Sequence, residues 1–214
     1  VPLLELVTEP KTFDTNDDVA SKSASNCAKQ LQLILWYLGV SEANMEKGEM
    51  RVEANISLSN DKSKLGTKVE VKNLNSFKSV EKAIKFELDR MLKLYESGRQ
   101  EEIVQETRGW DENKGATYSQ RKKESSHDYR YFPEPDLPKM KLHEAFNLDE
   151  MMNVLPELPD AKRKRYRSDF GIKDEDIESY INDPNLALWF EEISTILIEK
   201  EKIKIASNYI ISDF

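Results

Sequence analysis

The chain has 214 residues, of which 38% are hydrophobic and 34% charged, and a formal net charge of −8. This composition indicates a folded protein of one large or two ordinary domains and excludes a chain dominated by disorder. The single cysteine, Cys27, excludes an internal disulfide framework and a cysteine-based zinc site. Because no long apolar run or signal peptide is visible, we expect no membrane span and a cytoplasmic location. The chain does not begin with Met, and we interpret it as a piece of a longer protein.

The first predicted elements are a strand and a long helix. Period-two alternation over residues 1–9 predicts a strand that ends at Pro10. Apolar residues at helical spacing from about residue 17 to residue 38 predict a helix that stops at Gly39. Cys27 falls on the apolar stripe of this helix, so we expect it to be packed in the core rather than reactive.

Two further strands carry one apolar and one polar face each. Residues 50–58 and 67–73 alternate cleanly, and the short polar loop between them predicts an antiparallel pair. If the apolar faces share a core, the opposite face gathers polar and charged side chains, namely Arg51, Glu53, Asn55, Ser57, Lys68, Glu70 and Lys72.

This polar face has the chemistry of a magnesium–nucleotide site. Carboxylates bind a hard cation, lysine and arginine neutralise phosphate, and asparagine and serine orient the remaining groups. The alternative is a solvated sheet face with cross-strand charge pairs, and the pattern by itself favours that alternative.

A helix is predicted to follow, from Asn75 or Ser76 as its N-cap to Gly98 as its stop. The free amides at its start offer an anion-binding junction, although simple capping is the commoner use. Residues 103–110 and 116–121 predict a second hairpin. On it, Arg108 shares a face with Glu106 and Trp110.

The basic residues around this hairpin have two interpretations. They could converge near one anionic ligand, or each could make an ordinary surface pair. The residues concerned are Arg108, Arg121, Lys123 and Arg130.

Residues 127–138, HDYRYFPEPDLP, form an unusual segment. Its three prolines exclude a helix interior or a central strand. The aromatic residues and Arg130 favour an extended segment packed against a site, whereas the prolines alone equally suit a rigid strap between domains.

Beyond Pro138 the pattern predicts a small helical domain, with helices over residues 160–170, 174–181, 185–197 and 203–211. The first of these helices is strongly basic. Lys162, Arg163 and Arg165 are candidates for contact with a nucleic-acid backbone, although such a cluster is usually a solvated face.

Taken in order, the residues resemble a known family, the B subunits of the tRNA-dependent aspartyl/glutamyl amidotransferases. The long runs GTKVEVKNLNSF and HDYRYFPEPDLP are the most specific matches. The resemblance rests on residues 2–10, 37–41, 45–48, 51–57, 66–77, 105–108, 127–138 and 155–159.

The resemblance implies an α+β fold in two parts. Residues 1–138 would be the C-terminal part of a glutamine-synthetase-like antiparallel cradle, and residues 139–214 a helical tRNA-binding domain. It implies a ligase that uses ATP and Mg²⁺ to phosphorylate the side-chain carboxylate of Glu-tRNA(Gln) or Asp-tRNA(Asn). Glutamine-derived ammonia then gives the amide. The implied partners are an amidase (A) subunit, a small C subunit and the mischarged tRNA, without membrane or DNA.

Site roles follow from the resemblance by position. Magnesium ligands would be Glu5, Glu70 and Glu53, the last at a position where the family commonly has Asp. Lys72, Arg51 and Arg130 would contact phosphate or carboxylate in catalysis. The cofactor-binding set would be Asn55, Asn73, Ser76 and Arg108, and the tRNA-binding set Lys162, Arg163 and Arg165.

We expect this piece to be inactive by itself. The alternative to an enzyme is a non-catalytic tRNA-binding or assembly module, in which the polar sheet face is only solvated surface.

Overall fold

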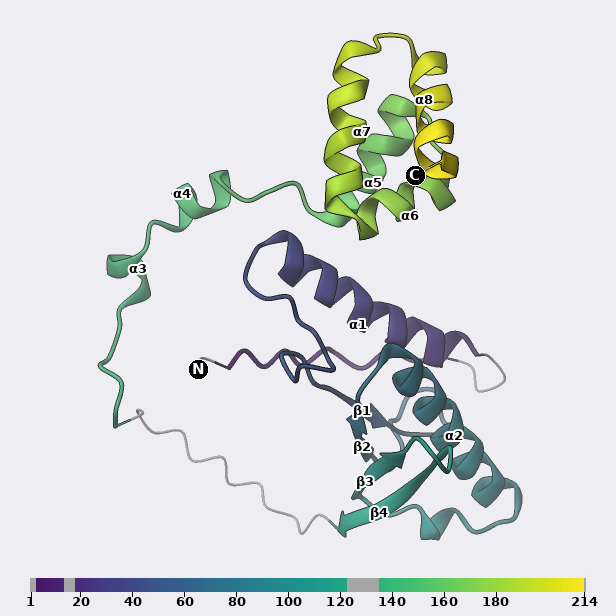
Figure 1. Cartoon of the computed structure of the whole chain (residues 1–214). Helices are drawn as coiled ribbons and strands as arrows, with labels where there is room; N and C mark the ends of the chain where they lie inside the picture. Colours follow the sequence, from purple (N-terminus) through teal and green to yellow (C-terminus); the bar gives the residue numbers. More distant parts are fainter. Residues whose placement is uncertain (1–2, 14–17, 123–134, 214) are drawn as a thin grey trace. The chain divides into compact units, whose positions relative to one another are not determined.

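The computed structural model of the chain describes residues 3–13, 18–122 and 135–213 (Figure 1). Arg130 and residues 127–134 of the proline-rich segment lie outside these described residues. The chain forms two compact units, Val1–Gln30 with Ala43–Arg130 and Leu31–Glu42 with Tyr131–Phe214. Helices and one four-stranded sheet make the fold α+β, as predicted. None of the described helices is long and apolar enough to cross a membrane.

The first unit contains the sheet and two long helices, close to the predicted ranges. Its elements are α1 (Val19–Tyr37, which also enters the second unit), β1 (Val52–Ile56), β2 (Val69–Leu74), α2 (Phe77–Glu96), the short 3₁₀ helix η1 (Gln100–Glu102), β3 (Glu106–Asp111) and β4 (Ala116–Lys122). The strands lie in the order β1-β2-β3-β4.

The sheet is mixed, which corrects the expected antiparallel arrangement. The pairs β1/β2 and β3/β4 are antiparallel, as the short loops predicted. However, β2 and β3 are parallel, with Glu70 opposite Thr107 and Lys72 opposite Gly109. The reason is the connection between the two strands. Helix α2 follows β2 and returns the chain to the end of the sheet where β2 began, so that β3 runs in the same direction as β2.

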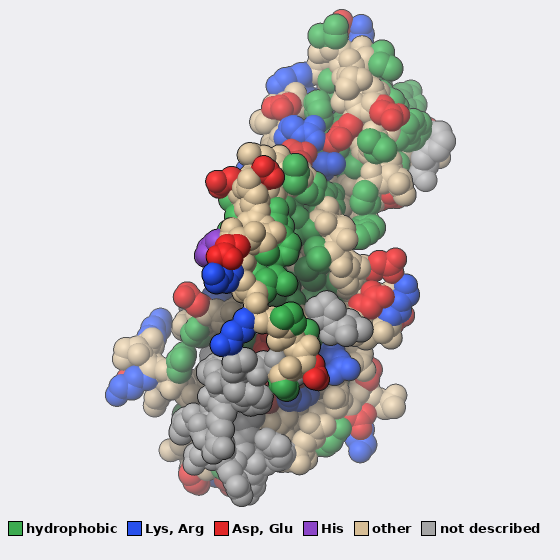
Figure 2. Space-filling view, turned by 90° about the vertical axis from the view of Figure 1, so that its left-hand side faces the viewer, with side chains coloured by type: hydrophobic (Ala, Val, Ile, Leu, Met, Phe, Trp, Pro, Cys, Tyr) green, Lys and Arg blue, Asp and Glu red, His purple; other side chains and the backbone are tan. Residues whose placement is uncertain are grey.

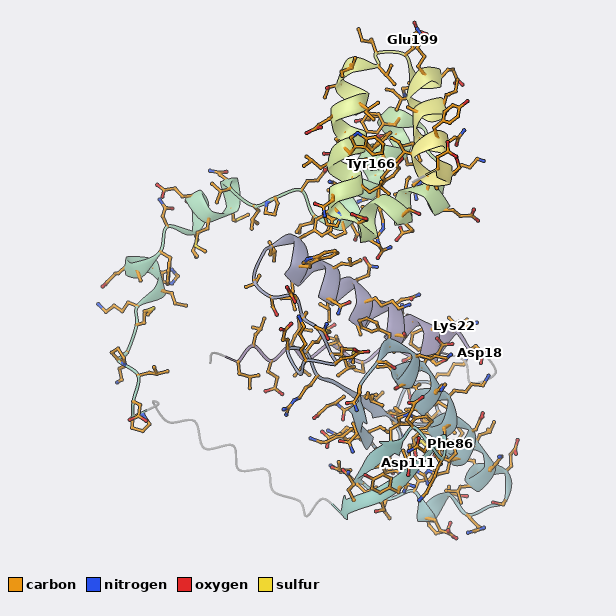
Figure 3. All side chains as sticks on the ribbon, viewed as in Figure 1. Asp18, Lys22, Phe86, Asp111, Tyr166 and Glu199 are labelled. Carbon is orange, nitrogen blue, oxygen red and sulfur yellow. The ribbon has the colours of Figure 1, made fainter. Side chains whose placement is uncertain are left out.

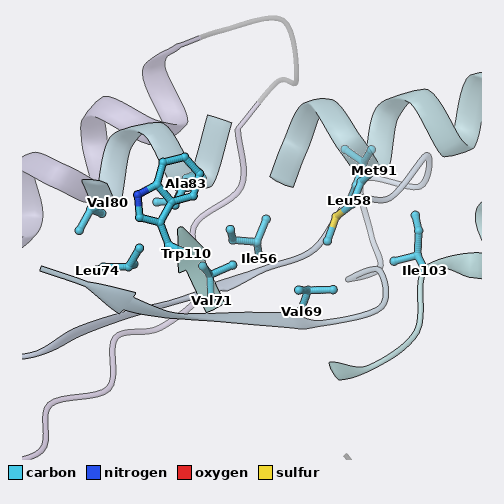
Figure 4. Close-up of a cluster of buried hydrophobic side chains, with 11 residues drawn as sticks. Ile56, Leu58, Val69, Val71, Leu74, Val80, Ala83, Met91, Ile103 and Trp110 are labelled. Atoms are coloured by element: carbon cyan, nitrogen blue, oxygen red, sulfur yellow. The ribbon is translucent and has the colours of Figure 1, made fainter. Parts of the chain in front are cut away.

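One face of the sheet packs against α2 and forms the core of this unit (Figure 4). Val69 and Val71 of β2 are fully buried there, as is Met91 of α2. Trp110 of β3 meets Phe86 of α2 edge-on, with 6.2 Å between the ring centroids. Each such buried side chain contributes about 1.5–3 kcal/mol relative to an exposed one. This face therefore fixes which side chains of every strand remain on the other side.

The strand predicted for residues 1–9 is wrong, because residues 3–13 form no secondary structure. Leu3 on one alternating face is 91% exposed and Leu4 on the other is 77% exposed, so neither face is buried. An alternating segment becomes a strand only where a neighbouring edge completes its backbone hydrogen bonds. No such neighbour pairs with it among the described residues.

The expectation that Cys27 lies in the core is also wrong, because its side chain is exposed. In this part of α1 the buried positions are Ser21, Ser25 and Ala28. The Ser25 hydroxyl donates to the carbonyl oxygen of Phe77 at 2.9 Å. These small residues let α1 approach the start of α2 closely, which turns Cys27 outward.

The second unit is built from helices and the last turns of α1. Its elements are α3 (Leu142–Ala145), α4 (Leu148–Asn153), α5 (Pro159–Arg165), the π-helical turn η2 (Tyr166–Phe170), α6 (Asp174–Asn182), α7 (Pro184–Ile196) and α8 (Lys200–Asp213). Tyr166 lies at the centre of its core (Figure 3). Tyr180 stacks on Phe190 with 4.6 Å between the ring centroids.

Candidate active site

The face of the sheet turned away from α2, here called the outer face, carries a row of polar side chains. Alternation along each strand places Glu53 and Asn55 of β1 on this face, because Val52, Ala54 and Ile56 belong to the core side. By the same rule β2 contributes Glu70 and Lys72. The ladder places Asn55 opposite Glu70, and Thr107 of β3 follows on the other side of Glu70. The predicted clustering on one face is thus confirmed for Glu53, Asn55, Glu70 and Lys72, whereas Arg51, Ser57 and Lys68 lie outside the two strands.

Lys72 sits between two carboxylates on the outer face. Its Nζ lies 3.0 Å from Oε1 of Glu53 and 4.0 Å from Oε2 of Glu70. The same Oε2 of Glu70 accepts a hydrogen bond from Oγ1 of Thr107 at 2.8 Å. The side chains of Lys72 and Glu53 are 38% and 45% exposed, whereas that of Glu70 is only 14% exposed. Along the row, Glu53 is therefore open to solvent, whereas the Glu70 carboxylate is largely buried and fixed by a hydrogen bond.

A β-bulge next to this row changes the course of β2. The register shifts between Val52 and Ala54 of β1, so that both Lys72 and Asn73 face the single residue Glu53. Asn73 has φ +64°, the left-handed region that asparagine tolerates better than most residues. A strained residue beside a charged cluster is a frequent feature of functional sites.

Ser76, predicted as a cofactor contact, is the N-cap of α2. Its Oγ accepts a hydrogen bond from the Ser79 amide at 3.0 Å, which confirms the predicted capping role. Asn73 and Ser76 thus flank the junction between β2 and α2.

Arg108 is not brought together with the outer-face residues. It lies on the α2 side of β3, where its Nη1 donates to Oε1 of Glu106 at 2.6 Å and its Nε lies 3.0 Å from Oε1 of Glu87. Glu87 is completely buried and also accepts a hydrogen bond from Thr117. Trp110, which shares the face of Arg108, is the sequence signal for this placement, because a large aromatic side chain marks the core side of a strand.

The other carboxylate in this buried group is Glu106. Burial by itself raises its pKa, but hydrogen bonds from Ser119 and Arg108 outweigh burial and hold the pKa below its ordinary value. Glu106 therefore stays ionised, and its charge is balanced by Arg108. The group is fully engaged in holding β3 and β4 on α2.

Of three other predicted site residues, two lie outside the strands of the sheet and one lies outside the residues that the structure describes. Glu5 is exposed in the segment without secondary structure. Arg51 is exposed directly before β1. Arg130 belongs to the residues that the structure does not describe.

The oxygen ligands of the outer face suit magnesium in part. Mg²⁺ usually takes one or two protein carboxylates and completes its shell with phosphate oxygens and water. Glu53 and Glu70 provide such carboxylates. Among the described residues, no group of three His, Cys, Asp or Glu side chains is placed to hold a metal ion, so Glu5 does not complete one. Glu53 and Glu70 are therefore the residues of this face that could hold a divalent cation.

The predicted tRNA-binding residues are held in ion pairs within the helical unit. Arg163 makes two hydrogen bonds to Glu178, at 2.6 and 2.9 Å, and its side chain is 14% exposed. Arg165 bonds Glu157 and Glu191. Lys162 lies 3.1 Å from Glu191 and is also 14% exposed.

The surface agrees with this pairing. On the side shown in Figure 2, basic and acidic side chains of the helical unit lie next to one another rather than in a patch of one sign. Burial by itself would raise the pKa of Glu191. Hydrogen bonds from Arg165, Tyr166 and Lys162 outweigh burial, so the pKa lies below its ordinary value.

The part of the chain that carries this site matches a known protein family. Residues 1–147 match the family model described as the GatB/GatE catalytic domain, which is more than half of the chain. The chain belongs to the GatB/GatE catalytic-domain family. The matched range contains every outer-face residue described above and ends before α5.

Individual relatives extend the similarity over the whole chain. The chain is 42% identical over 214 residues to the B subunit of the chloroplastic/mitochondrial glutamyl-tRNA(Gln) amidotransferase of Oryza sativa subsp. japonica, covering 100% of this chain and 37% of the relative. It is 46% identical over 194 residues to the B subunit of the aspartyl/glutamyl-tRNA(Asn/Gln) amidotransferase of Herpetosiphon aurantiacus, covering 90% of this chain and 38% of the relative. The chain thus spans less than two-fifths of the length of these GatB/GatE relatives.

Two residues of the site region carried signals that the sequence interpretation did not use. Glu87 interrupts the apolar stripe of α2, and a carboxylate at such a position needs a buried partner, which is Arg108. Thr107 lies between the paired residues Glu106 and Arg108, and alternation places it on the outer face.

Proposed function

We propose that this chain forms part of the ATP-dependent catalytic domain of a tRNA amidotransferase, within its B subunit, with the nucleotide site on the outer face. The observation that carries the proposal is the row Glu53–Lys72–Glu70, which combines a lysine with two carboxylates on an open sheet face inside the matched range. The sheet would be part of a larger glutamine-synthetase-like cradle completed by the rest of the protein.

The roles of the residues follow from their chemistry and positions. Glu70 and Glu53 would hold Mg²⁺, and Lys72 would then be released to neutralise phosphate oxygens. Arg51, which is exposed directly before β1, would contribute a second positive charge. Asn55 and Asn73 have amide groups that orient substrate oxygens. Bound Mg²⁺ would draw charge from the phosphates as they separate. Arg108, which is engaged on the core side, would support the sheet rather than touch the nucleotide.

The proposed reaction has two steps on the aminoacyl group of the tRNA. A side-chain carboxylate oxygen of Glu-tRNA(Gln) or Asp-tRNA(Asn) attacks the γ-phosphorus of ATP, and ADP leaves with the electron pair of the broken bond. Ammonia, produced from glutamine by a partner amidase, then attacks the acyl carbon. Phosphate leaves, a proton is lost and the amide remains. Because both reactants of the first step are anions, positioning and charge neutralisation supply most of the catalysis.

The alternative is a tRNA-binding or assembly module without chemistry on the sheet. It would depend on Lys162, Arg163 and Arg165, whose ion pairs with Glu178, Glu157 and Glu191 leave little charge for phosphate. The enzyme proposal is therefore the better supported one.

The test uses the full-length protein assembled with its partner subunits. We expect Glu70→Gln to lower ATP hydrolysis dependent on mischarged tRNA by at least about 100-fold, because a carboxylate that would hold the charge-neutralising Mg²⁺ is lost. Binding of the tRNA should be unchanged. Glu96→Gln, at the exposed end of α2, is the matched control and should behave like the wild type. Unchanged hydrolysis in Glu70→Gln would remove the site from this face and support the alternative.

A further inference from the structure

Thr107 is the neighbour of Glu70 across the parallel strand pair. The two residues face each other in the β2/β3 ladder, and Oγ1 of Thr107 donates to Oε2 of Glu70 at 2.8 Å. Thr107 is 7% exposed, so this hydroxyl is shielded from water that would otherwise compete for the bond. A hydrogen bond to a charged carboxylate is among the stronger ones in proteins.

The geometry of this bond is set by the strand that carries Thr107. A β-branched side chain on a strand has few rotamers, so the hydroxyl direction depends on where the backbone of β3 lies. That backbone is held from the opposite face, because Arg108 joins Glu106 of its own strand to Glu87 of α2. The side chain of Arg108 is only 13% exposed. The residues on both sides of Thr107 in the sequence are thus anchored to the core.

The same oxygen of Glu70 is near both a donor hydroxyl and an ammonium group. Lys72 Nζ lies 4.0 Å from Oε2, on the side of β1, where Glu53 is its closer partner. Thr107 therefore acts from β3 and Lys72 from within β2. If Lys72 turns toward a phosphate, the Thr107 hydroxyl still holds the Glu70 carboxylate.

We infer that Thr107 is a positioning residue that orients the Glu70 carboxylate for its metal-binding role. This inference rests on the proposed function, because it assigns Thr107 a task toward the group that Glu70 would bind. Groups that orient a metal-binding carboxylate through a hydrogen bond commonly change metal affinity by about 10–100-fold when they are removed. The hydroxyl makes the contact and the branched Cβ only restricts its direction, so serine should largely replace threonine.

The experiment measures binding without turnover. The full-length protein in its complex is titrated with ATP at a series of Mg²⁺ concentrations, and the Mg²⁺ concentration for half-maximal ATP binding is recorded by calorimetry. We expect Thr107→Val, which keeps the shape of the side chain, to raise this concentration about 10-fold or more. Thr107→Ser should restore a value close to that of the wild type.

A double variant shows whether Thr107 acts through Glu70. In a Glu70→Ala background, adding Thr107→Val should cause no further change, because the acceptor of the hydroxyl is already absent. Thermal unfolding of each variant shows whether the sheet is intact.

The outcomes separate the inference from the function on which it rests. If Glu70→Ala weakens Mg²⁺-dependent binding but Thr107→Val does not, the inference is wrong and the proposed function stands. If Thr107→Ser is as weak as Thr107→Val, the hydroxyl is not the cause and the inference is again wrong. If Glu70→Ala binds normally, the proposed site itself is wrong.

Discussion

At the scale of single residues, the sheet uses charge in two different ways on its two faces. On the core side, Arg108 pairs with both buried carboxylates, Glu87 and Glu106, and Arg90 is a second partner of Glu87. Breaking such a buried pair is costly because it leaves an uncompensated charge away from water. On the outer face, Lys72 and Glu53 are more than a third exposed, and exposed pairs of this kind are worth about 0–1 kcal/mol. The outer pair can therefore open for a ligand, whereas the inner group cannot.

Glu112 shows how one exposed carboxylate ties the β3/β4 turn to α2. Its side chain accepts hydrogen bonds from Lys82 at 2.8 Å, Trp110 at 2.6 Å and Ser79 at 2.7 Å. These bonds lower the pKa of Glu112 from 4.5 to about 2. The ionised form is thus favoured by folding.

A pH-dependent loss of stability is expected for Glu112→Gln. Because the pKa of Glu112 is lower in the folded state than in the unfolded chain, its ionised form adds stability above about pH 4.5, and this contribution is lost as the pH falls toward 2. The variant should therefore be less stable than the wild type at pH 7, with a smaller difference at pH 3, measured by urea unfolding. A difference that does not vary with pH would contradict this assignment.

At the scale of elements, the local patterns predicted most helices and strands, and the connections decided the rest. The N-cap signal at Asn75 or Ser76 and the stop at Gly98 identified α2, and alternation identified β1 and β2. The parallel β2/β3 pair could not be predicted from strand patterns, because it depends on the path that α2 takes between the strands. Residues 3–13 show that a local pattern is not sufficient either. The predicted alternation is present there, but no strand forms because no neighbouring strand pairs with it among the described residues.

For the candidate site, too, local patterns predicted which residues share a face but not which strands pair. Alternation correctly put Glu53, Asn55, Glu70 and Lys72 on one face. It also put Arg108 with Trp110, but it did not say that this was the core face of β3. The hydrogen bond from Thr107 to Glu70 depends on strand pairing between distant parts of the chain, which no local pattern contains.

The start of α2 allows a test that separates capping from ligand binding at Ser76. Ser76→Ala should destabilise the protein by about 1 kcal/mol, since the Ser79 amide loses its acceptor. Ser76→Asp keeps a good cap and should keep that stability. If Ser76 also contacts a phosphate, the aspartate charge should weaken ATP binding in calorimetry. Unchanged ATP binding in Ser76→Asp would reduce the role of Ser76 to that of the cap.

At the scale of the whole molecule, the chain covers only part of the length of its relatives. It spans 37% of the rice relative and 38% of the Herpetosiphon relative. The outer face offers two carboxylates, and no three-residue metal group exists among the described residues. We therefore expect further ligands to come from the nucleotide and from other parts of the full-length protein, and catalysis to require the assembled complex.

Protection of Lys72 by nucleotide is the most direct test of a nucleotide site on the outer face. The assembled full-length protein is acylated at lysine with and without ATP and Mg²⁺, and the modified residues are quantified by mass spectrometry. Lys82 is an internal control, because its side chain is 45% exposed against 38% for Lys72 and it too is paired with a carboxylate, that of Glu112. We expect ATP with Mg²⁺ to protect Lys72 and to leave the modification of Lys82 unchanged. Equal modification of Lys72 with and without the nucleotide would contradict a nucleotide site on the outer face.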